Sequence, residues 1–393
     1  QRSNITEKWS SLELKYFTQY IVRDVAMEPN TVTEATLPNG NTQRTTPEVF
    51  YPTGKHLTNG VQLQSIWDLS ARNVLIAGVD VWGRKLQTGR EKHIRVDILN
   101  PAGTIIKTNN IVRGETPIPQ SSFSSAGIFF QNETRFLNDK LTMILGGRFD
   151  GIVVKNEQGT DVDYIITNGV RNDAPPTQKV TFNAGRENSL SWSGNAGFLY
   201  KLFEQTHLSL NLARAFRSPS LEERFKFIDL GNYVRLGDRS LKPETSYSAD
   251  LGLRIWKSKF NLQAGLFLNR LSNMIIETPG EFIYTLTAES KPDTLPALVN
   301  ANVRKALLYG FDMKFAYNFS SDFVLYGSGA YVRGIALETE DNLPLIPPLN
   351  GRMGLRYTFK KAGSVDLSVF GAAKQDKIAE GEKETPGYYR LDA

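Results

Sequence analysis

The chain has 393 residues, no cysteine and a formal net charge of +5, with 46 basic and 41 acidic residues spread along its length. The lack of cysteine excludes disulfides and thiolate metal sites, and the scattered basic residues argue against a nucleic-acid partner. Although 40% of the residues are hydrophobic, no apolar run approaches the roughly 20 residues that a membrane-spanning helix needs.

Apolar and polar residues alternate with a period of two along most of the chain, which is the pattern of a β-strand with one apolar face. Leu208, Leu210 and Leu212 alternate with polar or small residues, and residues 311–319 carry a large apolar side chain at every odd position. The sequence predicts thirteen strands and the start of a fourteenth at Tyr388. They lie near 9–26, 61–70, 73–87, 121–137, 140–154, 188–202, 206–216, 244–256, 259–276, 302–319, 322–336, 348–360 and 363–374.

The connections between these strands alternate between short turns and long loops. The long loops are predicted at 27–60, 89–120, 155–187, 217–243, 277–301, 337–347 and 375–387. A soluble β-sandwich shows the same alternation of side chains, but its strands are shorter, and a compact soluble domain rarely carries so many long loops. Long strands with short turns on one side and long loops on the other predict an all-β, transmembrane antiparallel β-barrel in contact with outer-membrane lipid.

Five tryptophans lie near predicted strand ends, as an interfacial girdle of aromatic side chains requires. Trp9, Trp67 and Trp256 lie toward the short turns, whereas Trp82 and Trp192 lie toward the long loops.

Two motifs lie at the ends of loop 217–243. The segment 213–223, which contains Phe216, Arg217, Ser218 and Pro219, resembles a conserved barrel motif of TonB-dependent outer-membrane receptors, with Phe-Arg-Ala-Pro at its centre. Segment 237–246 resembles the following box of that family through Leu241, Pro243 and Glu244, although residues 238–240 depart from the usual Asn-Pro-Asn. Further matches follow in the family's order at 73–80, 141–150, 310–312, 346–348 and 386–392.

The resemblance implies a 22-stranded barrel occluded by an N-terminal plug, which imports a ligand with energy from the TonB complex. On this interpretation residues 1–393 form one partial β-barrel domain without the plug, so the sequence is expected to be a piece of a longer protein. About six strands and the plug would precede it, and about three strands would follow. The TonB complex would be contacted through a segment outside this sequence.

The resemblance further implies a receptor in the bacterial outer membrane that binds a scarce ligand, such as a ferric siderophore or heme, at its extracellular loops. A passive porin and a soluble β-rich binding protein are the alternatives. No catalytic motif is present, so neither an enzyme nor a cofactor is predicted.

Heme receptors of this family typically place a ligating histidine in the loop between the two motifs, and residues 220–240 contain none. Tyr233 is left as a candidate heme ligand. His56, His93 and His207 are far apart in the sequence and are interpreted as ordinary surface histidines. Arginines beside aromatic residues in this loop suit an anionic ligand such as a metal chelate.

Arg224, Tyr233 and Arg235 are therefore the predicted ligand contacts. The motif residues are interpreted as structural: Phe216, Arg217, Ser218, Pro219, Leu241, Pro243 and Glu244. Two carboxylate clusters, at 161–163 and 338–341, are candidates for calcium but are interpreted as solvated loop tips, and no metal site is predicted.

Overall fold

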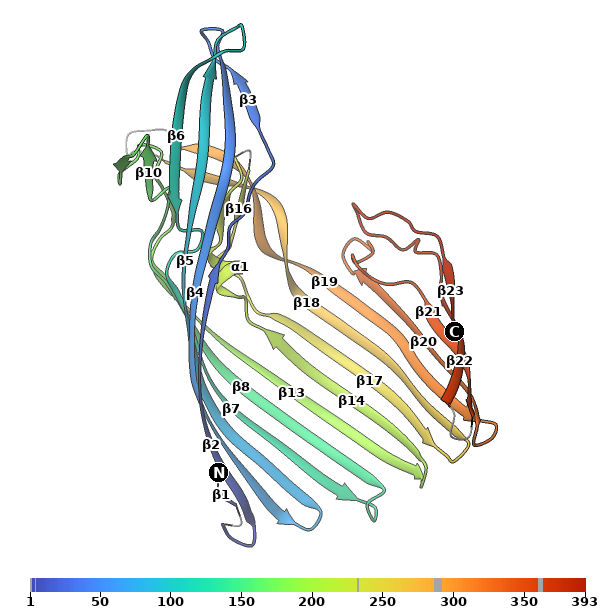
Figure 1. Ribbon diagram of the computed structural model, residues 1–393. Coiled ribbons are helices and arrows are strands. Elements are labelled where there is room, and N and C mark those ends of the chain that lie inside the picture. The colour runs from blue at the N-terminus through green and yellow to red at the C-terminus, as the bar shows by residue number, and fades with distance from the viewer. Residues whose placement is uncertain (1, 4, 232, 286–291, 360–362) are drawn as a thin grey trace.

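One large antiparallel sheet curves around a hollow to form a wall, as Figure 1 shows for the computed structural model. The structure describes residues 2–3, 5–231, 233–285, 292–359 and 363–393. The wall strands are β2 (Trp9–Asp24), β4 (Thr42–Ser70), β5 (Asn73–Leu99), β7 (Ser121–Phe136), β8 (Leu141–Asn156), β13 (Gly185–Phe203), β14 (Thr206–Arg217), β17 (Glu244–Trp256), β18 (Phe260–Tyr284), β19 (Asp293–Asn318), β20 (Phe323–Ala336), β21 (Asn350–Phe359), β22 (Gly363–Ala372) and β23 (Tyr388–Asp392). Each pairs with the next in this order.

Smaller elements lie on the long-loop side of the wall. They are β3 (Thr33–Thr36), β6 (Ile105–Glu115), β9 (Gly159–Asp161), β10 (Tyr164–Thr167), β11 (Val170–Asn172), β12 (Lys179–Phe182), α1 (Leu221–Phe225), β15 (Phe227–Asp229) and β16 (Val234–Leu236). On the short-turn side, β1 (Arg2–Ser3) pairs with β2. Within the described residues, no helix is long and apolar enough to cross a membrane.

The all-β prediction and the fourteen predicted strand positions are confirmed, but the boundaries on the long-loop side are wrong. β4 begins at Thr42 and not near 61, and β5 runs on to Leu99. Likewise β18 and β19 extend through most of the predicted loop 277–301. Once a strand rises above the apolar band both of its faces meet water, so the ladder of backbone hydrogen bonds continues without any alternation of apolar residues.

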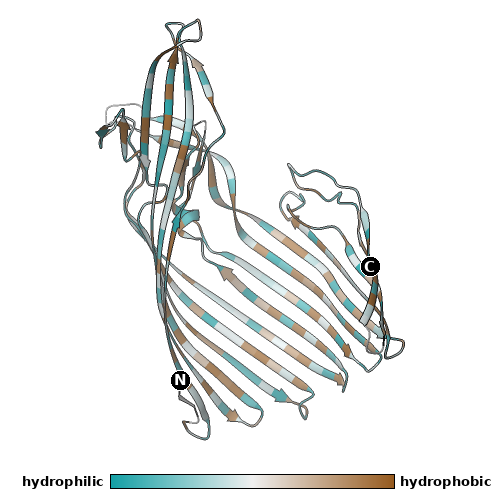
Figure 2. Cartoon of the chain, in the orientation of Figure 1, coloured by the Kyte–Doolittle hydropathy of each residue, from teal (hydrophilic) through white to brown (hydrophobic). Residues whose placement is uncertain are grey.

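The outward face of the wall is apolar and exposed. Leu251 is 49% exposed, Leu266 is 57% exposed and Leu190 is 88% exposed, although each lies within a regular strand. Figure 2 shows the alternation of hydrophobic and hydrophilic residues along the lower strands. An exposed apolar face of this extent is unusual for a protein in water and is what a lipid-facing barrel wall requires.

The inner face carries polar side chains held in ion pairs. Arg148 of β8 contacts Asp80 at 2.6 Å and Asp150 at 2.5 Å. Gly127 on the neighbouring strand leaves the space for this guanidinium, because a Cβ atom there would collide with it. Paired charges of this kind suit a water-filled or occluded lumen and not a lipid contact.

The predicted aromatic girdle needs two corrections. Trp256 alternates with the outward Ile255 at the end of β17 and contacts Arg254, so it is not on the lipid-facing side. Trp9 stacks on Trp67 with ring centroids 5.1 Å apart, near the short turns. Trp192 is 45% exposed on the outward face. Trp82, however, alternates with the exposed Val81 and stacks on Phe123 on the inner face, so it is not a membrane-interface residue.

Candidate functional site

Loop 217–243 folds into a compact unit against the inner side of the wall. It begins with α1 and continues into the antiparallel pair β15 and β16. β16 then pairs in parallel with the extended part of β19, where Val234 lies opposite Ala297 and Leu236 opposite Val299. Figure 1 shows α1 on the hollow side of the sheet, where it contacts β5 and β8.

A capping box fixes the start of α1. The Ser220 side chain accepts a hydrogen bond from the backbone of Glu223, and the Glu223 carboxylate accepts one from the backbone N–H of Ser220. These reciprocal bonds satisfy two donors that a helix start leaves open. A helix as short as α1 depends on such a cap and on packing, since its own hydrogen bonds are too few.

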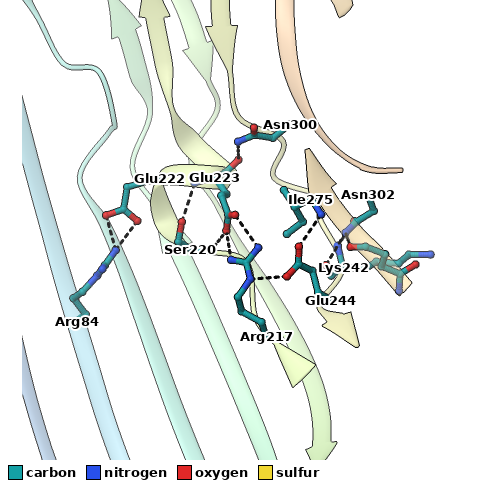
Figure 3. A network of polar contacts seen from close by, with 11 residues as sticks. Arg84, Arg217, Ser220, Glu222, Glu223, Lys242, Glu244, Ile275, Asn300 and Asn302 are labelled. Atoms are coloured by element: carbon teal, nitrogen blue, oxygen red, sulfur yellow. Dashed lines mark hydrogen bonds and ion pairs between the residues drawn. The ribbon is translucent and has the colours of Figure 1, made fainter. Parts of the chain in front are cut away.

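Arg217 joins the two sequence motifs (Figure 3). Its guanidinium donates to both carboxylate oxygens of Glu223, at 2.8 and 2.9 Å, and to Glu244 at 2.6 Å. Burial would raise the pKa of Glu223, but the hydrogen bonds from Arg217 and Ser220 hold it below the ordinary value. The carboxylate is therefore charged at neutral pH and keeps its part of the network.

Further contacts tie both motifs to neighbouring strands (Figure 3). Glu244 accepts a hydrogen bond from the backbone N–H of Ile275 at 2.8 Å. Asn302 accepts one from the backbone N–H of Lys242 at 2.6 Å, and Asn300 donates to the carbonyl of Glu223 at 2.8 Å. The first motif is thereby tied to β19, and the second to both β18 and β19.

On the opposite side, α1 is fixed to the wall by one ion pair and an apolar contact. Arg84 of β5 donates to both oxygens of Glu222, at 2.8 and 2.9 Å. Leu221 and Phe225 are fully buried against the inner-face residues Leu86, Ile152 and Val154. The loop therefore has a small core of its own.

Gly237 in the second motif meets a steric requirement. A Cβ atom at this position would lie 2.6–2.7 Å from backbone atoms of Arg224. Only glycine allows the chain to pass this close to the end of α1. The motif residues Pro219 and Leu241 are also buried, and Phe216 packs against the core around α1.

The three predicted ligand contacts have different surroundings. Arg224 is only 3% exposed and donates to the carbonyl of Arg239, so it does not reach solvent and is corrected to a buried residue. Burial lowers the pKa of Arg224. Arg235 is 42% exposed and forms a bidentate pair with Glu277, and Tyr233 lies partly buried directly before β16.

Sequence reasoning missed a buried ionic cluster beside this loop. Its centre is Glu115 on β6, whose side chain is 1% exposed. Lys92 lies 3.0 Å from this carboxylate, Arg113 lies 2.8 Å from it, and Arg90 also pairs with it. Burial lowers the pKa of Lys92, and the facing carboxylate of Glu115 opposes that effect.

The cluster continues from Arg113 into the loops. Arg113 also pairs with Asp161 at 2.9 Å and with Asp229 of β15 at 3.0 Å. Lys179 of β12 lies 3.1 Å from Asp161. Because these residues are separated by up to 116 positions, no local pattern joins them.

The interpretation of Asp161 as part of a solvated loop tip is therefore wrong, since its side chain is 5% exposed and paired with two cations. Asp163 accepts hydrogen bonds from Thr116 and Thr160. In the part of the chain that the structure describes, no group of three or more His, Asp or Glu side chains is arranged to hold a metal ion.

Acid should loosen the β15–β16 hairpin. Burial would raise the pKa of Asp229 and of Glu277, but Arg113 holds the first below its ordinary value, and Lys226 and Arg235 do the same for the second. Carboxylates with depressed pKa values stabilise the fold above their unfolded pKa, and this contribution is lost as the pH falls through the folded pKa. We expect the hairpin to lose hydrogen-exchange protection below about pH 4, after correction for intrinsic rates, while β13 and β14 keep theirs. Equal protection of the hairpin at pH 7 and pH 3 would contradict this.

A family model, a curated protein and solved structures are similar to this chain. The family description "TonB dependent receptor-like, beta-barrel" matches residues 4–393. Over 109 residues the chain is 30% identical to transferrin-binding protein A of Haemophilus influenzae, a match that covers 27% of this chain and 12% of that protein.

Two solved structures share the fold. The copper transporter OprC has a TM-score of 0.67 at 17% identity, covering 99% of this chain and 55% of OprC. The unliganded ferric citrate transporter FecA has a TM-score of 0.53 at 14% identity, covering 96% of this chain and 50% of FecA. The chain thus spans about half the length of these two proteins, and at such identities the likeness concerns the fold alone.

Proposed function

Because this chain belongs to the TonB-dependent receptor family, we propose that it is part of a receptor that binds a scarce ligand at its extracellular loops and imports it with TonB-derived energy. The family is bacterial and outer-membrane, and its members are transporters and binding proteins, not enzymes. The ligand of the whole protein, its coupling to TonB and its partners are all part of this proposal. The proposal also takes residues 1–393 as one partial barrel domain, whose lumen is filled by a plug domain.

The observation that carries the proposal is the family match over residues 4–393. The geometry supports a division of loop 217–243 into structural residues and residues that contact the ligand. Motif residues Arg217 and Glu244 hold α1 on the inner wall, so they serve structure. The β15–β16 hairpin beyond α1 leaves Arg235 partly exposed beside Tyr233, and we assign ligand contact to this pair.

The proposed ligand is a small anionic metal chelate. Arg235 can donate two parallel hydrogen bonds to a carboxylate, as it already does to Glu277. Tyr233 supplies an aromatic face and a hydroxyl at a neighbouring position. In the buried cluster the four cations Arg90, Lys92, Arg113 and Lys179 face three carboxylates, which adds positive charge near the hairpin.

A conductance measurement separates this proposal from a passive porin. The complete receptor, reconstituted in a planar bilayer, is expected to show no steady open-channel current, because the plug fills the lumen. Cells with an intact TonB complex should accumulate the ligand, whereas cells lacking TonB should only bind it. Steady current from the intact protein, or accumulation without TonB, would overturn the proposal.

A further inference from the structure

The first charged side chain on the outward face is a lysine or an arginine on eight of the described wall strands. Reading up each wall strand from its short turn, the outward side chains are uncharged through the apolar band. On four strands, the first charged outward residue above it is Lys55 of β4, Lys85 of β5, Lys155 of β8 and Arg186 of β13, and all four are exposed.

Four further strands also carry a basic residue as their first outward charge. The first charged outward residue is Arg214 on β14, Arg270 on β18, Lys305 on β19 and Arg333 on β20. Among the described wall strands with a charged outward residue, only β2 differs, because its first one is Asp24. The sequence has nearly as many acidic as basic residues, 41 against 46, so composition does not account for this bias.

These outward cations have no carboxylate partner among the described residues. Arg214 instead lies over the ring of Trp192 at 4.1 Å, and Arg186 donates to Asn188. On the inner face, Arg148 is paired with Asp80 and Asp150, and Arg356 is paired with Asp366. Exposed cations that have no carboxylate partner within the chain are free to meet anions from outside it.

Three of these residues form a row across neighbouring strands. Lys85 lies opposite Ser122, Ser122 opposite Lys155, and Lys155 opposite Arg186 in the sheet register. Neighbouring strands are about 4.8 Å apart, which places the backbones of Lys85 and Lys155 about 10 Å from each other. A cavity of about 400 Å³ lies between them, with Glu157 as the one carboxylate among its lining residues, and Gln120 donates a hydrogen bond to it.

Lys85 lies at the height of lipid headgroups. Ten residues separate Leu75, near the short turn of β5, from Lys85, which corresponds to about 26 Å along the membrane normal at a tilt of about 40°. The apolar band of an outer-membrane barrel is about 25 Å tall. Directly below the row, Val81 and Leu190 are exposed on the same face.

We propose that Lys85, Lys155 and Arg186 bind the phosphate groups of an outer-leaflet lipid whose headgroup carries more than one phosphate. Two cations about 10 Å apart match two phosphates on one headgroup better than a single phosphate. The acyl chains of the lipid lie against the apolar face that begins below the row, a contact that free phosphate lacks. This site is on the outside of the wall and is independent of the ligand that the loops take up.

Native mass spectrometry of the complete receptor in detergent tests the proposal, with bis-phosphorylated lipid A as the probe. Removing two lysines, K85Q with K155Q, should weaken binding about thirtyfold, at about 1 kcal/mol for each cation near a lipid surface. The matched control is K107Q with K383Q, two exposed lysines that have no ion-pair partner among the described residues. Heat-modifiable migration in gels verifies that each variant is a folded barrel.

The outcomes separate the sources of phosphate. Selective loss in K85Q/K155Q, with the control unchanged, supports the site. Equal binding of the dephosphorylated lipid would overturn it, because the contact would then be apolar only. Displacement of the lipid by inorganic phosphate at about 10 mM would also overturn it, since a site of such affinity for the free ion does not need the lipid. Unchanged binding in K85Q/K155Q would leave these lysines without the proposed role.

Discussion

Replacing Phe225 with alanine is expected to detach α1 from the barrel wall while the barrel stays folded. Phe225 is 1% exposed, packs against Leu86, Ile152 and Val154, and meets the ring of Phe182 edge-on at 5.9 Å. Truncating a buried phenylalanine costs about 3–5 kcal/mol. The other apolar cluster of this loop, around Phe227 and Val234, holds the β15–β16 hairpin and not α1, so we expect the local opening free energy of α1 to fall by most of this amount.

Hydrogen exchange of residues 217–243 measures the effect directly, since local opening exposes the backbone of this segment without global unfolding. Leu230→Ala is the matched control, because Leu230 lies in the same loop but is 48% exposed. Protection in Phe225→Ala equal to that in the control would show that the ion pairs of Arg84 and Arg217 are sufficient to hold α1.

The sequence predicts the wall well because lipid imposes a strict rule on it. Each outward position must be apolar and each strand must cross the same thickness, so the pattern at 311–319 reports both the strand and its apolar face. Above the membrane that rule ends. Much of the predicted loop 27–60 belongs to β4, in which both Pro47 and Pro52 lie, Pro47 at an irregularity of the register with β5.

The site is only partly predictable, for two physical reasons. α1 has five residues, too few to show a helical period, so nothing in the sequence indicated that Arg224 faces inward. The cluster around Glu115 joins β5, β6, β12 and β15 through the folded topology, and charge patterns along the chain do not reveal such contacts. The family resemblance identified the motif residues, but their hydrogen-bond and ion-pair partners are seen only in the structure.

Arg235 should contribute to ligand binding, and its ion-pair partner Glu277 allows this role to be tested separately. Loss of a hydrogen bond to a charged group costs about 1.5–3 kcal/mol, which is about a tenfold to hundredfold change in affinity. Arg235→Gln is therefore expected to weaken ligand binding by at least about tenfold. The measurement is equilibrium binding of the chelate to the purified receptor.

Glu277→Gln separates a ligand contact from a structural ion pair. If Arg235 binds the ligand, this variant weakens the competing carboxylate, so affinity stays the same or rises. If Arg235 only holds the hairpin to β18, then Arg235→Gln and Glu277→Gln remove the same ion pair and weaken ligand binding equally. The double variant then binds the ligand no more weakly than either single variant. Lys226 also pairs with Glu277, at 2.5 Å, so hydrogen exchange of β15 and β16 must accompany the binding data. Weaker binding in Arg235→Gln, with hairpin protection and Glu277→Gln affinity both preserved, assigns Arg235 to the ligand.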